Sequence, residues 1–266
     1  MKKFFLLLLA ALPFVMTSCG DDDEPEMTLN KSEITLNYGA TDNSLKCNLK
    51  NPVWGSSNEF VATVDGDGKV TARHEGTAKI TATAGGQTAS AVVTVKATNN
   101  NFRMPILSFG QTKEQIASQM KAWEADGVFP LTLSDDTDAL AYLPKGLNPG
   151  YGYNFKNNKL YTASLTLTED QGDEGDIYVF VGQRYQKYGE GSNDTEGYDY
   201  TLYSNADDPD NSTIVVQVIV FYDTLDYSIY WAENRSTKTR AADIFSAPEF
   251  KAAREVSRRI SAAARK

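Results

Sequence analysis

The side chains that most often bind metals or act as nucleophiles are scarce in this sequence. It has one histidine, His74, and two cysteines, Cys19 and Cys47. A multi-histidine metal site needs several such ligands, and a Ser-His-Asp triad would depend on this one histidine. His74 stands beside Glu75 at a predicted strand end or loop, where a lone histidine is typically a surface residue. We therefore predict no catalytic residue, no metal site and no cofactor.

Acidic side chains gather in loops at residues 65–68, 169–176 and 205–211, which could in principle hold Ca²⁺. Calcium prefers oxygen-rich loops, but the well-defined calcium loop places its ligands at fixed positions over about twelve residues. None of the three loops follows that spacing. We expect a tight hairpin turn at residues 65–68, because its glycines can take positive φ, and solvated loops at the other two.

A fourth acidic cluster contains Asp135, Asp136 and Asp138. A glycosidase needs two carboxylates that face one sugar from about 5 to 10 Å apart, which neighbouring loop aspartates rarely supply. The sequence also lacks a nucleophile motif and a phosphate-binding loop. A carboxylate-dependent glycosidase is therefore the least favoured function, and we predict that the chain is not an enzyme.

The N-terminal segment has the features of a secretory signal. Lys2 and Lys3 precede an apolar stretch at residues 4–15, which is shorter than the roughly twenty residues that a membrane-spanning helix needs. Residues 16–19, Met-Thr-Ser-Cys, then resemble the lipobox of bacterial lipoproteins. The resemblance implies that residues 1–18 are removed and that Cys19 is lipidated, which would anchor the protein to the outer membrane.

A run of acidic residues follows at positions 20–24, Gly-Asp-Asp-Asp-Glu. Such a run is typical of a solvated tether, here residues 19–26. It also resembles the acidic export signal that follows the lipidated cysteine in Bacteroidota-type lipoproteins. That resemblance implies a lipid-anchored protein on the cell exterior, with retention on the periplasmic side as the alternative.

The overall composition narrows the class of partner. The chain has 35 acidic against 26 basic residues and a formal net charge of −9 at pH 7. Such an excess of acid argues against a nucleic-acid partner. With Cys19 lipidated, Cys47 has no partner for a disulfide, and we expect it to be a small buried hydrophobe.

Residues 27–96 show short alternating runs separated by Gly, Asn and Asp, which predicts an antiparallel β-sandwich. In one run Ala78, Ile80, Ala82 and Ala84 occupy alternate positions and would share the buried face. The sequence from residue 53 to 95, with its "FVATVDGDGKV" and "EGTAKITATA" motifs, resembles a bacterial immunoglobulin-like domain of group 2. The resemblance implies an Ig-like spacer or adhesive module without catalytic residues.

An asparagine-rich linker is predicted at residues 97–101, and a helix begins after it. Thr112 and Gln115 form a capping-box pattern, and Ile116, Met120 and Trp123 recur at helical spacing on one face. Strands are expected at residues 139–143, 151–155 and 160–167, with a turn at 157–158.

A second helix is expected from Asp176, because Ile177, Phe180, Val181, Tyr185 and Tyr188 recur at helical spacing. Strand-like runs then follow at 198–204, 213–222 and 227–231. Residues 102–235 are thus predicted to be an α+β domain, in which two halves, each a helix plus antiparallel strands, form one sheet with helices on one face. The region loosely resembles halves of the beta-lactamase-inhibitor-protein and outer-membrane-assembly lipoprotein families, which implies a sheet that binds a protein or another ligand.

Tyrosine is concentrated in this second region. Its flat apolar ring and polar tip suit both the stacking of sugars and the anchoring of a protein partner. Tyrosines two apart on a strand share a face, so pairs on the predicted strands form stripes. The candidates for a recognition surface are Tyr151, Tyr153, Tyr198, Tyr200 and Tyr203.

Residues 236–266 form a basic tail with an apolar stripe at Phe250, Ala253, Val256 and Ile260. It is predicted to be a basic amphipathic helix that docks on an anionic partner or, preferably, an alanine-rich helical or frayed terminus. Together the patterns predict a surface-displayed, non-catalytic lipoprotein that binds an unidentified glycan or protein. The alternative is a periplasm-facing structural or assembly lipoprotein that binds an envelope protein.

Overall fold

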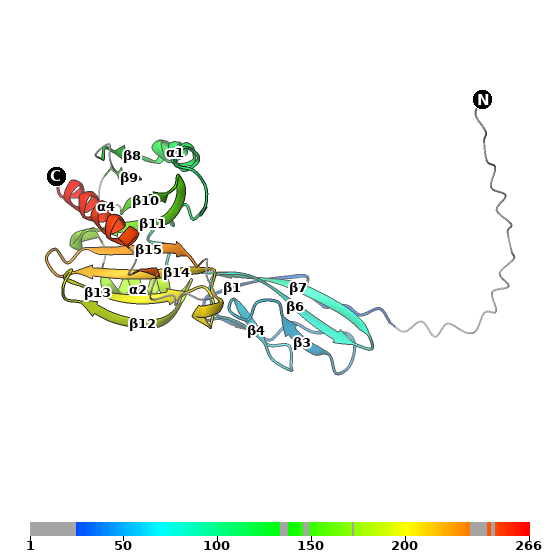
Figure 1. Cartoon of the computed structure of the whole chain (residues 1–266). Helices are drawn as coiled ribbons and strands as arrows, with labels where there is room; N and C mark the ends of the chain where they lie inside the picture. The colour runs from blue at the N-terminus through cyan, green and yellow to red at the C-terminus, as the bar shows by residue number, and fades with distance from the viewer. Residues whose placement is uncertain (1–24, 134–137, 146–148, 172, 235–243, 246–247) are drawn as a thin grey trace, which may run out of the picture.

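The structure is a computed structural model that describes residues 25–133, 138–145, 149–171, 173–234, 244–245 and 248–266. The predicted signal segment, Cys19, most of the acidic tether, Asp135 and Asp136 lie outside the described residues. The described chain is mostly β, with a small two-sheet sandwich followed by one large sheet (Figure 1). No helix among the described residues is long and apolar enough to cross a membrane.

The first unit, called here the N-terminal sandwich, consists of two small sheets that enclose an apolar core. Its four-stranded sheet has the order β1-β7-β6-β3, in which β1 pairs in parallel with β7, and its three-stranded sheet has the order β2-β5-β4. The predicted alternation is confirmed along β6, because Ala78, Ile80 and Ala82 are buried between exposed or half-buried neighbours. The strands are β1 (Glu33–Asn37), β2 (Thr41–Asp42), β3 (Val53–Ser56), β4 (Ala62–Val64), β5 (Val70–Ala72), β6 (Gly76–Ala84) and β7 (Gln87–Lys96).

The turn expected at residues 65–68 is confirmed. It joins β4 to β5, Gly68 has φ +81°, and one carboxylate oxygen of Asp65 accepts hydrogen bonds from the backbone N–H groups of Asp67 and Lys69. Two other expectations for this unit are wrong. His74 is 5% exposed rather than a surface residue, because its ring stacks on Phe60, and Cys47 is only half-buried.

The C-terminal region, residues 102–266, is built on one eight-stranded antiparallel sheet with the order β12-β13-β14-β15-β11-β10-β9-β8. Each half contributes four neighbouring strands, and the halves meet where β11 pairs with β15. The prediction of one continuous sheet made of two halves is confirmed. The strands are β8 (Val128–Leu131), β9 (Ala139–Pro144), β10 (Gly150–Lys156), β11 (Lys159–Leu167), β12 (Gln186–Asn193), β13 (Tyr198–Ser204), β14 (Ile214–Phe221) and β15 (Tyr227–Glu233).

The two edge strands, β8 and β12, were not predicted, so each half has one strand more than expected. β8 has only four residues and contains a proline, and β12 is polar and contains two glycines. Such sequences are common on edge strands, which lack a second neighbour to pack against and must avoid further pairing. They carry little of the apolar alternation by which a strand is recognised.

The two helices predicted within residues 102–235 cover one face of this sheet, as expected, although a third helix covers the other face. α1 (Lys113–Lys121) has the expected capping box between Thr112 and Gln115, continues as the 3₁₀-helix η1 (Ala122–Asp126), and stops at Gly127 with φ +83°. α2 (Glu174–Gly182) begins two residues before the expected Asp176, because Asp173 caps it. It also ends before Tyr185 and Tyr188, so these two do not belong to its stripe. The apolar residues of both helices share one core with the sheet.

The opposite face is covered by α4 (Pro248–Ala264), which lies over β10 and β11 (Figure 1). The predicted apolar stripe of Phe250, Ala253, Val256 and Ile260 is fully buried against the sheet. The expectation of a helical terminus is confirmed, whereas the frayed alternative is not, because this helix packs against the chain's own sheet. Its basic residues Arg254, Arg258 and Arg265 also form ion pairs with the chain's own carboxylates, at Glu196, Asp223 and Asp226.

Candidate binding hollow and interdomain joint

Four of the five predicted recognition tyrosines are buried, which corrects the prediction for them, and three of these lie in the core under α1 and α2. Tyr151 and Tyr153 share a face of β10 as expected, but this face packs under α1, and the rings are 3% and 0% exposed. Tyr151 meets the ring of Trp123 edge to face, and the hydroxyl of Tyr153 contacts the sulfur of Met120. Tyr203 points into the same core from β13. None of these rings can meet a partner from outside.

Tyr198 and Tyr200 lie on the other face of the sheet, side by side on β13 with ring centroids 6.3 Å apart. Tyr198 is 4% exposed and so does not form an open surface either, whereas Tyr200 is half-buried. The two rings line a surface hollow of about 440 Å³, called here the Arg254 hollow. Its described lining residues are Ser192, Asn193, Asp194, Thr195, Glu196, Tyr198, Tyr200, Gln217, Phe245 and Arg254.

Arg254 enters the hollow from α4. Its Nη2 atom lies 2.5 Å from the Oε2 atom of Glu196, and its guanidinium carbon lies 5.2 Å from the ring centre of Tyr198. The side chain is only 8% exposed, yet its Nε and Nη1 atoms have no hydrogen-bond partner among the described residues. A buried donor that lacks a partner costs about 1–3 kcal/mol, and more on a charged group. Two donors of this buried guanidinium are therefore without an acceptor among the described residues.

Gln217 supplies an acceptor from the floor of the hollow. It is the single polar residue in the strand sequence "IVVQVIVF" of β14 and is 3% exposed. Its Oε1 atom has no hydrogen-bond partner among the described residues. An amide at a buried strand position stabilises nothing by itself, because burial of an unpaired polar atom is unfavourable. A lone amide inside an apolar strand is the sequence pattern that points to this residue, which is not among the predicted site residues.

The hollow contains groups that can bind a ligand through hydrogen bonds and charge. Its polar groups include the carboxylates of Asp194 and Glu196, the guanidinium of Arg254 and the amides of Asn193 and Gln217. Cysteine, histidine and lysine are missing from the described lining. Among the described residues no group of three or more His, Cys, Asp or Glu side chains could hold a metal ion, so the acidic loops form no such cluster where they are described. A second hollow of about 490 Å³ shares Glu196 and Arg254 with the first and is otherwise lined by Phe221 and α4 residues.

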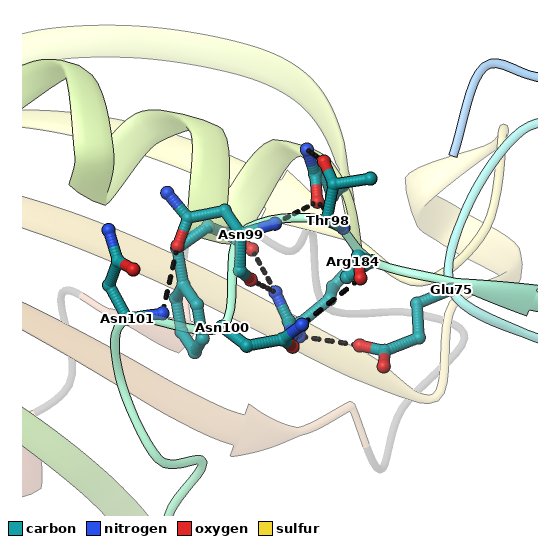
Figure 2. Close-up of polar contacts among 9 residues, drawn as sticks. Glu75, Thr98, Asn99, Asn100, Asn101 and Arg184 are labelled. Atoms are coloured by element: carbon teal, nitrogen blue, oxygen red, sulfur yellow. Dashed lines mark hydrogen bonds and ion pairs between the residues drawn. The ribbon is translucent and has the colours of Figure 1, made fainter. Parts of the chain in front are cut away.

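The predicted linker forms a joint between the two units (Figure 2). The side chain of Gln183, which follows α2, accepts hydrogen bonds from the backbone N–H groups of Thr98 and Asn99 and donates one to the hydroxyl of Thr98. Its backbone carbonyl accepts a hydrogen bond from the N–H of Glu75 in the N-terminal sandwich, at 2.8 Å. The polar linker side chains and backbone are thus used for contacts rather than left in solvent.

Arg184 is the centre of this joint. Its Nη1 atom donates to the carbonyl oxygens of Phe180 and Asn99, its Nη2 atom donates to Asn100, and its Nε atom lies 2.6 Å from the carboxylate of Glu75 (Figure 2). The guanidinium also lies over the ring of Phe180 at 4.2 Å. Nearby, an exposed ion pair joins Arg73 of the sandwich to Asp207 of the C-terminal region.

Comparison with known proteins identifies the first unit. Residues 28–95 match the model of the bacterial Ig-like domain (group 2) family, and the N-terminal sandwich is therefore an Ig-like domain. Ig-like domains of this family are in general not catalytic. No curated protein matches the chain.

Proposed function

We propose that this protein is a non-catalytic lipoprotein, anchored to the outer membrane through lipid on Cys19 and displayed on the cell exterior. In this proposal the Ig-like domain is a spacer, and the C-terminal region is an α+β domain that binds a glycan or protein ligand. The observation that carries the binding role is the Arg254 hollow, in which a buried guanidinium and a buried amide lack partners beside two tyrosine rings. Buried polar groups in folded proteins are nearly always hydrogen-bonded, so these groups call for a partner such as a bound ligand.

The position of the hollow supports the spacer role. β13 begins at Tyr198, which lines the hollow, and ends at Ser204. Three residues after this end, Asp207 forms an ion pair with Arg73 of the Ig-like domain. A strand of this length separates its ends by about 20 Å. The hollow therefore opens at the end of β13 that lies away from the Ig-like domain. The contacts of Gln183 and Arg184 hold that arrangement.

Display is tested by protease accessibility of the C-terminal region on intact cells, with lysed cells and a Cys19→Ala variant for comparison. We expect digestion on intact cells and release of the Cys19→Ala variant from the membrane fraction. Protection until lysis would contradict display and favour a periplasm-facing lipoprotein that binds an envelope protein. Retention of the Cys19→Ala variant in the membrane would contradict lipid anchoring.

Binding is tested with the purified protein lacking residues 1–19, screened against arrays of glycans and of extracellular and envelope proteins. We expect a ligand whose capture is weakened by Tyr200→Ala, because Tyr200 is the half-buried ring of the hollow. The control is Tyr222→Ala, which removes an exposed tyrosine outside the hollow that donates a hydrogen bond to Asp199. Equal effects of the two variants would place the binding site elsewhere.

A further inference from the structure

We infer that the Arg254 hollow binds a neutral saccharide, which rests on the proposed binding function and names its ligand class. The inference is drawn from three properties of the lining: its charge, its unpaired hydrogen-bonding atoms and its lack of aliphatic side chains. Its volume of about 440 Å³ is within the range of sites that bind small ligands.

Charge disfavours an acidic ligand. Two carboxylates, Asp194 and Glu196, and one guanidinium, Arg254, line the hollow. The charge of Arg254 is already offset by Glu196, whose Oε2 atom lies 2.5 Å from Nη2. A uronic acid or sulfated sugar would bring a further negative charge close to these carboxylates, and like charges in a partly desolvated site repel strongly. An uncharged ligand avoids this cost.

The unpaired atoms require a ligand that both donates and accepts hydrogen bonds. Arg254 has two donors without a partner, Nε and Nη1, and Gln217 has one such acceptor, Oε1. A carboxylate or phosphate only accepts, so it would leave Gln217 unpaired, and an ammonium group only donates, so it would leave Arg254 unpaired. A hydroxyl group does both. Neighbouring hydroxyls of a sugar could satisfy the guanidinium and the amide and also donate to Asp194.

The remaining lining distinguishes a sugar from a peptide. Of the described lining residues none is Ala, Val, Leu, Ile or Met, and the apolar surface comes from Tyr198, Tyr200 and Phe245. A peptide anchor is usually an apolar side chain in a fully desolvated pocket, which this polar hollow does not offer. An aromatic ring among hydrogen-bonding groups suits a sugar, whose C–H face packs on the ring while its hydroxyls reach polar partners.

A substitution at Gly191 can displace the aromatic ring of Tyr200 without removing it. A Cβ atom at Gly191 on β12 would lie 2.6 Å from the hydroxyl oxygen of Tyr200, so a Gly191→Ala variant must shift this ring. Gly189 is the matched control on the same strand, because its added Cβ would meet Leu202 at an ordinary 3.7 Å. Neither glycine has a positive φ, so alanine is compatible with both backbones.

The test is calorimetric titration of the protein lacking residues 1–19 with neutral gluco-, manno-, galacto- and xylo-oligosaccharides, and with oligogalacturonates as the acidic probe. We expect at least one neutral series to bind, the oligogalacturonates not to bind, and Gly191→Ala to weaken binding by up to about tenfold. Gly189→Ala should leave the affinity within about twofold. Circular dichroism and unfolding curves of both variants check that they fold.

Three results of the sugar titrations would each overturn the inference. They are binding of the acidic series alone, neutral binding that Gly191→Ala and Gly189→Ala affect equally, and no neutral binding at millimolar concentration. A protein or peptide whose capture depends on Gly191 would also overturn it, while the proposed binding function would stand. Failure of the proposed function is seen separately, as the absence of any hollow-dependent ligand in the array screens.

Discussion

The Nε atom of Arg184 lies 2.6 Å from the Oε2 atom of Glu75, and this ion pair joins the end of α2 to the Ig-like domain (Figure 2). The Arg184 side chain is 8% exposed and makes three further hydrogen bonds, so the pair is one contact in a dense polar joint. Burial lowers the pKa of Arg184, while the Glu75 carboxylate opposes that change. The contacts of Arg184 with Glu75 and with its hydrogen-bond acceptors therefore offset the cost of burying the charged guanidinium.

An Arg184→Met variant should loosen this joint. It leaves the carbonyls of Phe180 and Asn99 without their donor and removes the ion pair with Glu75, and we expect a loss of about 1–3 kcal/mol in unfolding free energy. Urea unfolding measures the loss, and small-angle scattering should show a broader range of interdomain distances. The control is Asp207→Asn, which breaks an exposed pair and should cost about 1 kcal/mol or less. Equal losses would show that the joint does not depend on Arg184.

A Gly150→Ala variant should displace α4. A Cβ atom added at Gly150 would lie 2.1 Å from the Cγ2 atom of Ile260, so helix and strand can approach this closely only because the strand has no side chain there. We expect a loss of about 1–3 kcal/mol, measured by urea unfolding, and faster proteolysis within α4.

Gly182 in α2 provides the control for that experiment. A Cβ added there would meet no atom within 4 Å, so Gly182→Ala should stabilise the protein by about 0.5–1 kcal/mol through helix propensity. A neutral result for Gly150→Ala would show that α4 does not need this close contact.

The two asparagines in the turn between β10 and β11, Asn157 and Asn158, should respond differently to replacement by glycine. Asn157 and Asn158 have φ of +53° and +55°, a conformation that glycine adopts more easily. Asn158 also accepts a hydrogen bond from the N–H of Lys113 and donates one to Glu114, which ties the hairpin to α1. We therefore expect Asn157→Gly to be neutral or slightly stabilising and Asn158→Gly to destabilise by about 1 kcal/mol in thermal unfolding. A larger loss of stability for Asn157→Gly than for Asn158→Gly would contradict the role of the Asn158 hydrogen bonds to α1.

His74 should make the stability depend on pH. Burial lowers its pKa from 6.5, although the hydrogen bond to the Phe60 carbonyl opposes the shift. Because the folded pKa is below the unfolded one, the stability that His74 contributes is present above about pH 6.5 and is lost as the pH falls toward the folded pKa.

The variant that tests this effect is His74→Gln, which cannot titrate but can still donate to Phe60. Between pH 7 and 5 the wild type should lose more unfolding free energy than the variant, by at most about 1.4 kcal/mol per pH unit. Carboxylates with lowered pKa that do not face His74, such as Asp42, affect both proteins alike and cancel in the comparison. Parallel pH profiles would contradict the role of His74.

Local patterns predicted most of the elements of this fold. The capping box at Thr112, the turn at Asn157 and the stripe of Phe250 were all readable, because each depends on residues a few positions apart. The edge strands were not predicted. β12 in particular is polar, and it is a strand because it pairs with β13.

The candidate site was predictable only in part, because it is made by contacts between distant segments. The sequence shows that Tyr198 and Tyr200 share a face, but not that α4 covers the sheet and brings Arg254 to them. For the same reason it could not show that Tyr151 and Tyr153 point under α1. Which face of a strand is buried depends on what packs on it, and the spacing along the strand does not specify this.

Because α4 comes late in the sequence, its packing has a consequence for folding while the chain is being synthesised. Strands β9, β10 and β11 can pair with one another as soon as they are available, but one of their faces is covered by residues 248–264. A chain still being synthesised or exported will expose that face until the helix follows. Folding of the first half is thus linked to arrival of a segment about a hundred residues later, and a holding chaperone would have its binding surface during that interval.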